Sequence, residues 1–289
     1  MVVSLGELTT VPSYRTISHA DARQLIADRA PTVVDVRTPG EYATLGHIPG
    51  AWLLPVDLIA SAPAVVEDRS APVLVYCEHG VRSRHASELL VAAGFTEVLN
   101  LAGGLASWTG ARDFGEGAVR GPSAWLLENA DLLPRGGRVL DVACGRGRHA
   151  LLLAGAGFAV RAIDRDADTM GRLREVASRL QLHLDTAVVD LEVDPPPSLG
   201  ASEYDVVLAF NYLHRPLMPA IREAVKPGGV MFYETFTARQ AERGHPRNPA
   251  FLLNDGELPG LLAPLVPLRQ REGEFGGRWI ASIVAERPK

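Results

Sequence analysis

Apolar strand-like segments alternate with helix-like segments along the whole chain, and this alternation constrains the fold more than any other feature. The strand-like segments are Thr32–Val36, Pro72–Tyr76, Glu97–Leu99, Arg138–Val142, Ala159–Ile163, Thr186–Val189, Asp205–Phe210 and Val230–Glu234. The helix-like segments include Ser18–Asp28 with Ser18 as N-cap, Arg84–Ala93, Ala124–Leu133 and Asp166–Leu180. This alternation predicts an α/β protein.

A polar, glycine-rich stretch divides the alternating pattern in two. Residues 109–122 contain four glycines and no apolar periodicity, which is typical of a linker. A chain of 289 residues is long enough for two domains. We therefore predict one domain at residues 1–112, a linker at 113–121 and a second domain at 122–289.

Composition excludes several classes of protein. The chain is 47% hydrophobic and 22% charged, with a net charge of −5 and no basic cluster, so we expect no nucleic-acid partner. No run of about 18 apolar residues is present, and three prolines interrupt the apolar stretch at 258–268, so we expect no membrane partner. No charged segment precedes an apolar stretch at the N-terminus, and the two cysteines lie in separate glycine-rich motifs. These features predict a cytoplasmic protein without a disulfide.

Cys77 directly follows an apolar strand, and a helix is expected to begin about six residues later. The loop C-E-H-G-V-R-S between them should turn several backbone N–H groups toward the sulfur, and the helix N-terminus adds positive potential. Arg82 adds a charge, and Gly80 permits unusual backbone angles. These effects predict a lowered pKa for Cys77 and a nucleophile that can carry a negative persulfide. The alternative is an inert, buried cysteine at the end of a strand.

Three segments of the first domain resemble the rhodanese family, in the family's order. They are D-V-R-T-P-G-E-Y-A-T-L-G-H-I-P-G-A at 35–51, C-E-H-G-V-R-S from Cys77, and L-A-G-G-L-A-S-W at 101–108. The resemblance covers about residues 14–112 and implies a rhodanese-like α/β domain. Its implied catalytic residues are Cys77, the sulfur-accepting nucleophile, and Arg82.

The resemblance also implies an anion-binding loop made by Glu78, His79, Gly80, Val81, Arg82 and Ser83, with Asp35 and Arg37 supporting it from the neighbouring strand end. The loop is one residue shorter than in related phosphatases, which favours sulfur over phosphate. Neither His79 nor His47 has a second ligand at a useful spacing, so we expect no metal site.

A second glycine motif, V-L-D-V-A-C-G-R-G-R-H at 139–149, follows the strand that contains Asp141. With Ala150 it also matches the dinucleotide fingerprint G-x-G-x-x-A, so a nicotinamide-dependent oxidoreductase is an alternative. Asp141, Asp164 and Asp190 lie at or near three successive strand ends. A carboxylate beside the glycine turn repels a pyrophosphate but attracts a cationic sulfonium, and Asp164 is placed to accept hydrogen bonds from ribose hydroxyls.

The order of these features across residues 122–289 resembles a class I methyltransferase, most closely the tellurite-resistance methyltransferases. The resemblance implies a Rossmann-like domain that uses S-adenosylmethionine (SAM). The implied cofactor-binding residues are Asp141, Ala143, Gly145, Gly147, Asp164, Asp190 and Leu191. The implied substrate-binding residues follow the fourth strand and are Asn211, Tyr212, His214 and Arg215. We also expect residues 244–248 to form a loop over the pocket, in which His245 and Arg247 suit an anionic acceptor.

The sequence therefore predicts a bifunctional enzyme. One domain transfers sulfane sulfur from a small donor such as thiosulfate through a Cys77 persulfide. The other transfers a methyl group from SAM to a small acceptor, for which a thiol or chalcogen nucleophile is attractive. In the alternative, the rhodanese-like domain is a sensing or partner-binding module attached to a methyltransferase.

Overall fold

The computed structural model describes residues 13–289, which form two compact units. The first unit contains the described residues up to Ile59 together with Val66–Val119, and the second contains Ala60–Val65 and Arg120–Lys289. Within the described part of the chain, every helix is too short or too polar to cross a membrane.

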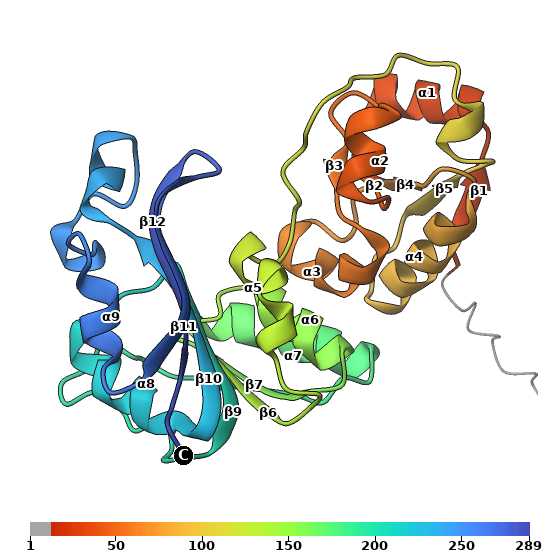
Figure 1. The fold of residues 1–289 in the computed structure, drawn as a ribbon. Helices are drawn as coiled ribbons and strands as arrows, with labels where there is room; N and C mark the ends of the chain where they lie inside the picture. The colour runs from red at the N-terminus through yellow and green to blue at the C-terminus, as the bar shows by residue number, and fades with distance from the viewer. Residues whose placement is uncertain (1–12) are drawn as a thin grey trace, which may run out of the picture. The chain divides into compact units, whose positions relative to one another are not determined.

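The first unit is built on a five-stranded parallel sheet in the order β1-β5-β4-β2-β3 (Figure 1). Its elements are β1 (Arg15–Ile17), α1 (His19–Arg29), β2 (Thr32–Asp35), α2 (Pro39–Thr44), β3 (Trp52–Leu53), β4 (Val73–Tyr76), α4 (Val81–Ala92), β5 (Val98–Leu101) and the 3-10 turn η2 (Leu105–Ser107). The 3-10 turn η1 (Val56–Ser61) and the short helix α3 (Ala62–Val65) follow β3 in the chain. The central strand β4 is buried along its whole length, as its unbroken apolar sequence requires in a parallel sheet.

The predicted capping of α1 is confirmed, because the Ser18 side chain accepts a hydrogen bond from the Asp21 N–H. The predicted start of α4 at Arg84 is wrong, because the helix begins at Val81. Gly80 causes this difference. Its φ of 87° lies in the left-handed region, which turns the chain from the loop directly into the helix.

The residues predicted as a linker pair with the first unit at two points. Asp113 forms an antiparallel bridge with His47, and Val119 forms a parallel bridge with Leu53. The boundaries at residues 113 and 121 stay a prediction.

The second unit is built on a seven-stranded sheet in the order β11-β12-β10-β9-β6-β7-β8, in which only β12 is antiparallel to its neighbours. Its strands are β6 (Arg138–Val142), β7 (Ala159–Asp164), β8 (Leu184–Val188), β9 (Tyr204–Phe210), β10 (Val225–Phe236), β11 (Val266–Phe275) and β12 (Arg278–Glu286). Its helices are α5 (Ala124–Glu128), α6 (Arg148–Gly155), α7 (Ala167–Arg179), α8 (Met218–Ala224) and α9 (Glu257–Leu262). The 3-10 turns are η3 (Ala130–Leu132), η4 (Arg215–Leu217), η5 (Ala238–Glu242) and η6 (Pro249–Phe251).

Two apolar cores cover the two faces of this sheet. Alternate residues of β9 point to opposite faces, so Val207 and Ala209 join one core while Val206 and Leu208 join the other. Helices α8 and α9 pack on the first face, and α5, α6 and α7 pack on the second (Figure 1). The carboxyl ends of β6, β7 and β9, where their loops begin, are not covered by these helices and are therefore available for a site.

All strands predicted for the second domain are present, but β11 and β12 were not predicted. Most residues of β11 are exposed because it forms the sheet edge, so its sequence lacks the apolar pattern of a buried strand. Pro259 lies in the first turn of α9, where a proline is tolerated. Asp190 lies two residues beyond the end of β8.

Candidate active sites

The sulfur of Cys77 lies inside a ring of hydrogen-bond donors. The N–H of Gly80 donates to Sγ at 3.1 Å and that of Ser83 at 3.4 Å. Burial alone raises the pKa of the Cys77 thiol, but hydrogen bonds from the side chain and backbone of Ser83 and from the backbone of His79 and Gly80 outweigh it and lower the pKa. The predicted thiolate-stabilising loop is therefore present in the geometry.

Asp35 and Arg37 form a fully buried ion pair under this loop. The Arg37 guanidinium donates to Asp35 Oδ2 at 2.7 Å, to Glu78 Oε2 at 2.7 Å and to the carbonyl of Gly46 at 2.6 Å. Arg37 therefore holds the Glu78 side chain in place. The arrangement suits the supporting role predicted for Asp35 and Arg37. Glu78, which accepts a hydrogen bond from Arg37, belongs to the same hydrogen-bonding network.

Arg82 is held from outside the loop by Glu41, a residue that sequence reasoning missed. The Arg82 guanidinium donates to both carboxylate oxygens of Glu41, and these hydrogen bonds lower the pKa of Glu41 to about 2. Arg82 also lies close enough to Cys77 for the two charges to interact. The side chains of His79 and Val81 are exposed on the loop.

The L-A-G-G-L-A-S-W segment fixes the loop from behind. The N–H of Leu105 donates to the Cys77 carbonyl at 2.8 Å, and that of Ala106 donates to the Glu78 carbonyl at 2.9 Å. A Cβ at Gly104 would lie 2.4 Å from the Cys77 carbonyl oxygen, so only glycine fits there. This close approach explains the second glycine of the motif.

Asn100 is a second residue that sequence reasoning missed. It is 2% exposed on β5, and its Oδ1 lies 2.6 Å from the Ser83 hydroxyl. A buried amide in the otherwise apolar strand V-L-N-L needs a polar partner. That single polar residue was the available signal.

In the second unit, the glycine motif forms a tight turn between β6 and α6. Ala143, Gly145 and Gly147 all have positive φ, and a Cβ at Gly147 would lie 2.6 Å from the Leu173 side chain. The N–H of Gly145 donates to Asp164 Oδ2 at 2.9 Å. The turn is thus tied to the end of β7, which brings two predicted cofactor residues together.

Asp141 lies beneath this turn and is fully buried. Its Oδ2 has no hydrogen-bond partner among the described residues. Burial raises the pKa of Asp141 to about 7, although Arg148 and the Ala150 N–H act against the shift. Arg148, which was not predicted, is therefore the nearest positive charge to this carboxyl group.

A cavity of about 140 Å³ lies next to the turn. The predicted residues that line it are Ala143, Asp164, Asp190, Leu191 and Tyr212. Arg165, Val189 and Glu192 complete the lining and were not predicted. Three carboxylates around one small cavity suit hydroxyl donors and a positively charged ligand.

A wider cavity of about 600 Å³ shares Tyr212 with the first one. Its lining residues are Asn211, Tyr212, Leu213, Phe236, His245, Pro246, Arg247, Asn248 and Phe251. The segment after β9 and the loop at 244–248 therefore meet, as the sequence predicts for a substrate pocket. The Tyr212 hydroxyl is buried and has no hydrogen-bond partner in the described part of the chain. Burial, and to a lesser extent the nearby Glu192 and Asp190 carboxylates, raise the pKa of Tyr212.

His214 and Arg215 lie outside both linings. Arg215 donates to both oxygens of Glu257 at 2.7 Å and to the carbonyls of Ala250 and Leu252. All three of its nitrogens donate in these bonds, so it fixes the chain on either side of Phe251. The direct substrate contact predicted for Arg215 remains a prediction.

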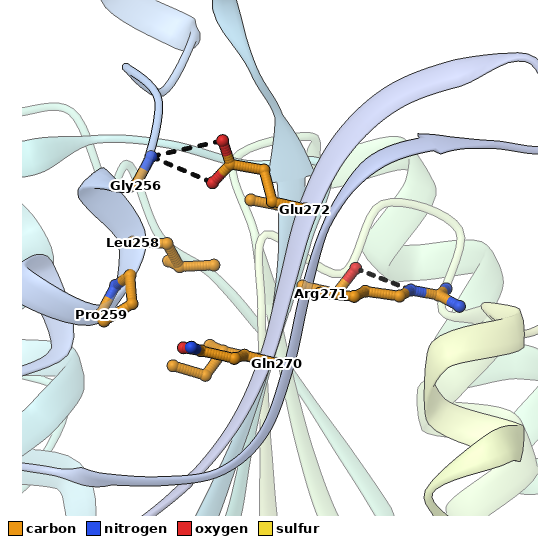
Figure 2. Close-up of a pocket in the computed structure, with 9 residues that line it drawn as sticks. Gly256, Leu258, Pro259, Gln270, Arg271 and Glu272 are labelled. Carbon is orange, nitrogen blue, oxygen red and sulfur yellow. Dashed lines mark hydrogen bonds between the residues drawn. The ribbon is translucent and has the colours of Figure 1, made fainter.

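A third cavity, of about 270 Å³, lies between α9 and the β11–β12 pair (Figure 2). Figure 2 shows Gln270 and Glu272 on the side of β11 that faces Leu258, whereas Arg271 extends from the opposite side of the strand. Glu272 accepts hydrogen bonds from the N–H of Gly256 and so closes one end. No predicted site residue lines this cavity.

Two family models match the chain. Residues 18–111 match the rhodanese-like domain, and residues 114–261 match a methyltransferase domain. The chain therefore belongs to the rhodanese-like family through its first part and to the methyltransferase family through its second. The predicted α/β fold, with a rhodanese-like domain followed by a methyltransferase domain, is confirmed.

Sequence relatives of the first part are sulfurtransferases by name. The thiosulfate sulfurtransferase GlpE of Coxiella burnetii is 37% identical over 95 residues, which are 33% of this chain and 87% of the relative. GlpE of Pseudomonas paraeruginosa is 39% identical over 100 residues, which are 33% and 84% of the two chains. A sulfurtransferase of Allochromatium vinosum is 43% identical over 77 residues, which are 26% and 69%.

Solved structures similar to the second part include methyltransferases. TehB from Haemophilus influenzae aligns with a TM-score of 0.49 and 20% identity, covering 57% of this chain and 62% of that chain. A SAM-dependent methyltransferase from Methanosarcina mazei aligns with a TM-score of 0.46 and 18% identity, covering 56% and 97%.

The methyltransferase family implies SAM as cofactor. The residues that line the smaller cavity fit this molecule, because Asp164 and Asp190 offer carboxylate acceptors. The buried Asp141 Oδ2 near the adjoining turn has no hydrogen-bond partner among the described residues. Asp164 and Asp190 would hold the adenosyl part there, with Leu191 against its base.

Proposed function

We propose that the chain is a bifunctional transferase that moves sulfane sulfur through Cys77 and a methyl group from SAM. The observation that carries the first activity is the lowered pKa of Cys77 inside its ring of N–H donors. The relatives named thiosulfate sulfurtransferase support thiosulfate as a donor.

In the proposed sulfur transfer, the Cys77 thiolate attacks the outer sulfur of thiosulfate. The sulfur–sulfur bond of the donor breaks, sulfite leaves with the bonding electrons, and Cys77 becomes a negatively charged persulfide. The N–H groups of Gly80 and Ser83 stabilise this charge. A thiol or cyanide acceptor then takes the outer sulfur, and the Cys77 thiolate is restored.

In the proposed methyl transfer, the smaller cavity holds the cofactor and the wider cavity holds a small acceptor with a thiol or chalcogen nucleophile. SAM supplies an electrophilic methyl group on a cationic sulfur when it is bound. The acceptor nucleophile would take this methyl group, and the electrons of the broken sulfur–methyl bond would stay with the cofactor sulfur. Tyr212, which lines both cavities, would align the two reactants, since such transfer depends mainly on positioning.

A cyanolysis assay with thiosulfate tests the first activity. Cys77→Ala should reduce thiocyanate formation to background, whereas Cys144→Ala should retain it, because Cys144 is buried and its pKa is raised by burial. Equal activity of Cys77→Ala and the unchanged protein would rule out the persulfide.

The alternative role of the first domain is sensing or partner binding. The same cyanolysis assay decides between the two, because a sensing module need not turn over thiosulfate.

A ligand comparison tests the second activity. S-adenosylhomocysteine (SAH) should raise the melting temperature of the protein, whereas NAD should leave it unchanged. A shift with NAD alone would favour an oxidoreductase and overturn the methyltransferase proposal.

A further inference from the structure

The wide cavity has apolar walls that a small inorganic acceptor would not contact. Leu213, Phe236 and Phe251 contribute apolar surface, and Tyr212 joins them from the cofactor side. The volume of about 600 Å³ is that of a site for an organic ligand. Phe251 is 42% exposed, so an aromatic ring is left uncovered at the cavity.

The segment that carries Phe251 is held in place by hydrogen bonds to its backbone. Arg215 donates to the carbonyls of Ala250 and Leu252, the residues on either side of Phe251, and is itself paired with Glu257. Asn248 accepts a hydrogen bond from the Ala250 N–H and so fixes the start of the same turn. The aromatic wall is therefore preorganised.

One positive charge at the cavity has no counterion among residues 13–289. Arg247 lines the cavity and has no hydrogen bond or ion pair with any described residue. Nearby Arg243, in contrast, pairs with Glu274 at 2.7 Å, and Arg239 stacks on Trp279. No Asp or Glu is among the described residues that line the cavity. A free guanidinium beside an apolar wall is complementary to an anionic group on an apolar body.

We propose that the methyl acceptor is an organic anion with a ring-sized apolar body. Its carboxylate-type group pairs with Arg247, and its body packs against Phe236 and Phe251. This inference rests on the proposed methyl transfer, and it refines the acceptor from any small nucleophile to an amphipathic one. The nucleophilic atom then lies toward Tyr212, the residue shared with the cofactor cavity.

Calorimetric titration of the full chain saturated with SAH tests this proposal. The probes are phenylacetate, the uncharged 2-phenylethanol of similar size, and tellurite as an inorganic anion. Phenylacetate should bind about tenfold more tightly than either of the others. The alcohol lacks the anionic group, and tellurite lacks the apolar body. Tellurite that binds as tightly as phenylacetate would overturn the need for an apolar body.

Matched variants separate the two halves of the site. Arg247→Gln should bring the affinity ratio of phenylacetate to 2-phenylethanol close to one, whereas Arg243→Gln should leave it unchanged, because Arg243 lies outside the lining. Phe251→Ala should weaken both probes while keeping their ratio. An unchanged ratio in Arg247→Gln would overturn the role of Arg247.

The SAH titration performed on each sample distinguishes the two levels of the proposal. Failure of the unsubstituted protein to bind SAH would contradict the methyltransferase function itself. Normal SAH binding without discrimination between phenylacetate and 2-phenylethanol would contradict only the amphipathic acceptor.

Discussion

The guanidinium of Arg82 forms two hydrogen bonds with the carboxylate of Glu41, so a residue of the active-site loop is positioned from α2. Glu41 is at the same time the capping-box partner of Thr38 at the start of that helix. The D-V-R-T-P-G-E segment and the cysteine loop, far apart in sequence, are therefore joined through one carboxylate.

Removing this carboxylate should impair sulfur transfer. Glu41→Gln should lower kcat/KM for thiosulfate about tenfold, because a charge-assisted hydrogen bond that orients Arg82 is worth about 1.5–3 kcal/mol. Thr38→Val is the matched control, since it removes the hydroxyl half of the capping box and keeps the Glu41 carboxylate that binds Arg82. Equal losses in the two variants would assign Glu41 a role in the helix cap alone.

The pKa of Cys77 should depend on Ser83. The rate of alkylation by iodoacetamide, measured against pH in a Cys144→Ser background, should have its midpoint below the ordinary cysteine value of about 8.5. Ser83→Ala should raise the midpoint, because it removes the Ser83 side-chain hydrogen bond and leaves only the Ser83 backbone N–H on the sulfur. Ser87→Ala, which alters a buried serine one turn further along α4, should not shift it. A midpoint that stays constant in Ser83→Ala would contradict this electrostatic account.

Gly104 should tolerate no side chain. Gly104→Ala would place a Cβ 2.4 Å from the Cys77 carbonyl oxygen, so the loop must move. We expect sulfurtransferase activity to fall at least about tenfold and the first domain to lose more than about 1 kcal/mol of stability. Gly40→Ala, where no atom lies within 4 Å, serves as control. Cyanolysis and thermal melting measure the two effects, and an active Gly104→Ala variant would show that the close approach is dispensable.

Asp141 should make the stability of the methyltransferase domain depend on pH. Its pKa is about 7 in the folded protein and about 3.9 in an unfolded chain, so the folded state binds the extra proton. The cost of burying the charge is absent below about pH 4, grows as pH rises toward 7 and is complete above that. Asp141→Asn should therefore raise the melting temperature at pH 8 by roughly 10 °C, with a gain that disappears near pH 4.

The control for this prediction is Asp168→Asn, an acidic residue in the first turn of α7 away from the cavities. It should show no such gain. Asp141→Asn should also bind SAM more weakly, because the cationic ligand loses its nearby carboxylate. A variant without any pH-dependent gain would mean that Asp141 is ionised at no cost.

Asp164 should be needed for cofactor binding. Asp164→Asn should weaken SAH binding about tenfold, since it removes a charged acceptor in the smaller cavity. The melting shift produced by SAH measures this directly. Asp185→Asn, an exposed aspartate on β8 outside the lining, should bind SAH normally. If Asp164→Asn binds SAH with normal affinity, the ribose of the cofactor does not bind at Asp164.

Much of the fold was predictable because local sequence patterns dominate it. Central parallel strands such as β4 and β9 are buried on both faces, so their sequences are continuous apolar runs that end where a loop begins. The edge strand β11 has no such pattern, because its pairing with β12 relies on backbone hydrogen bonds that every residue type except proline supplies. The helix start at Val81 also escaped prediction, since it depends on the conformation of one glycine.

The sequence by itself determined the two α/β units and the positions of Cys77, the proposed nucleophile, and of the acidic residues near the strand ends. Strand-to-loop transitions place such residues at the carboxyl ends of parallel strands. Only the tertiary structure decided which partners they meet. In that structure Arg82 pairs with Glu41, and Arg215 donates to the backbone on either side of Phe251. Arg247 lines the wide cavity and pairs with none of the described residues. These contacts join residues up to 41 positions apart, and no local pattern specifies a contact that forms only when separate elements pack together.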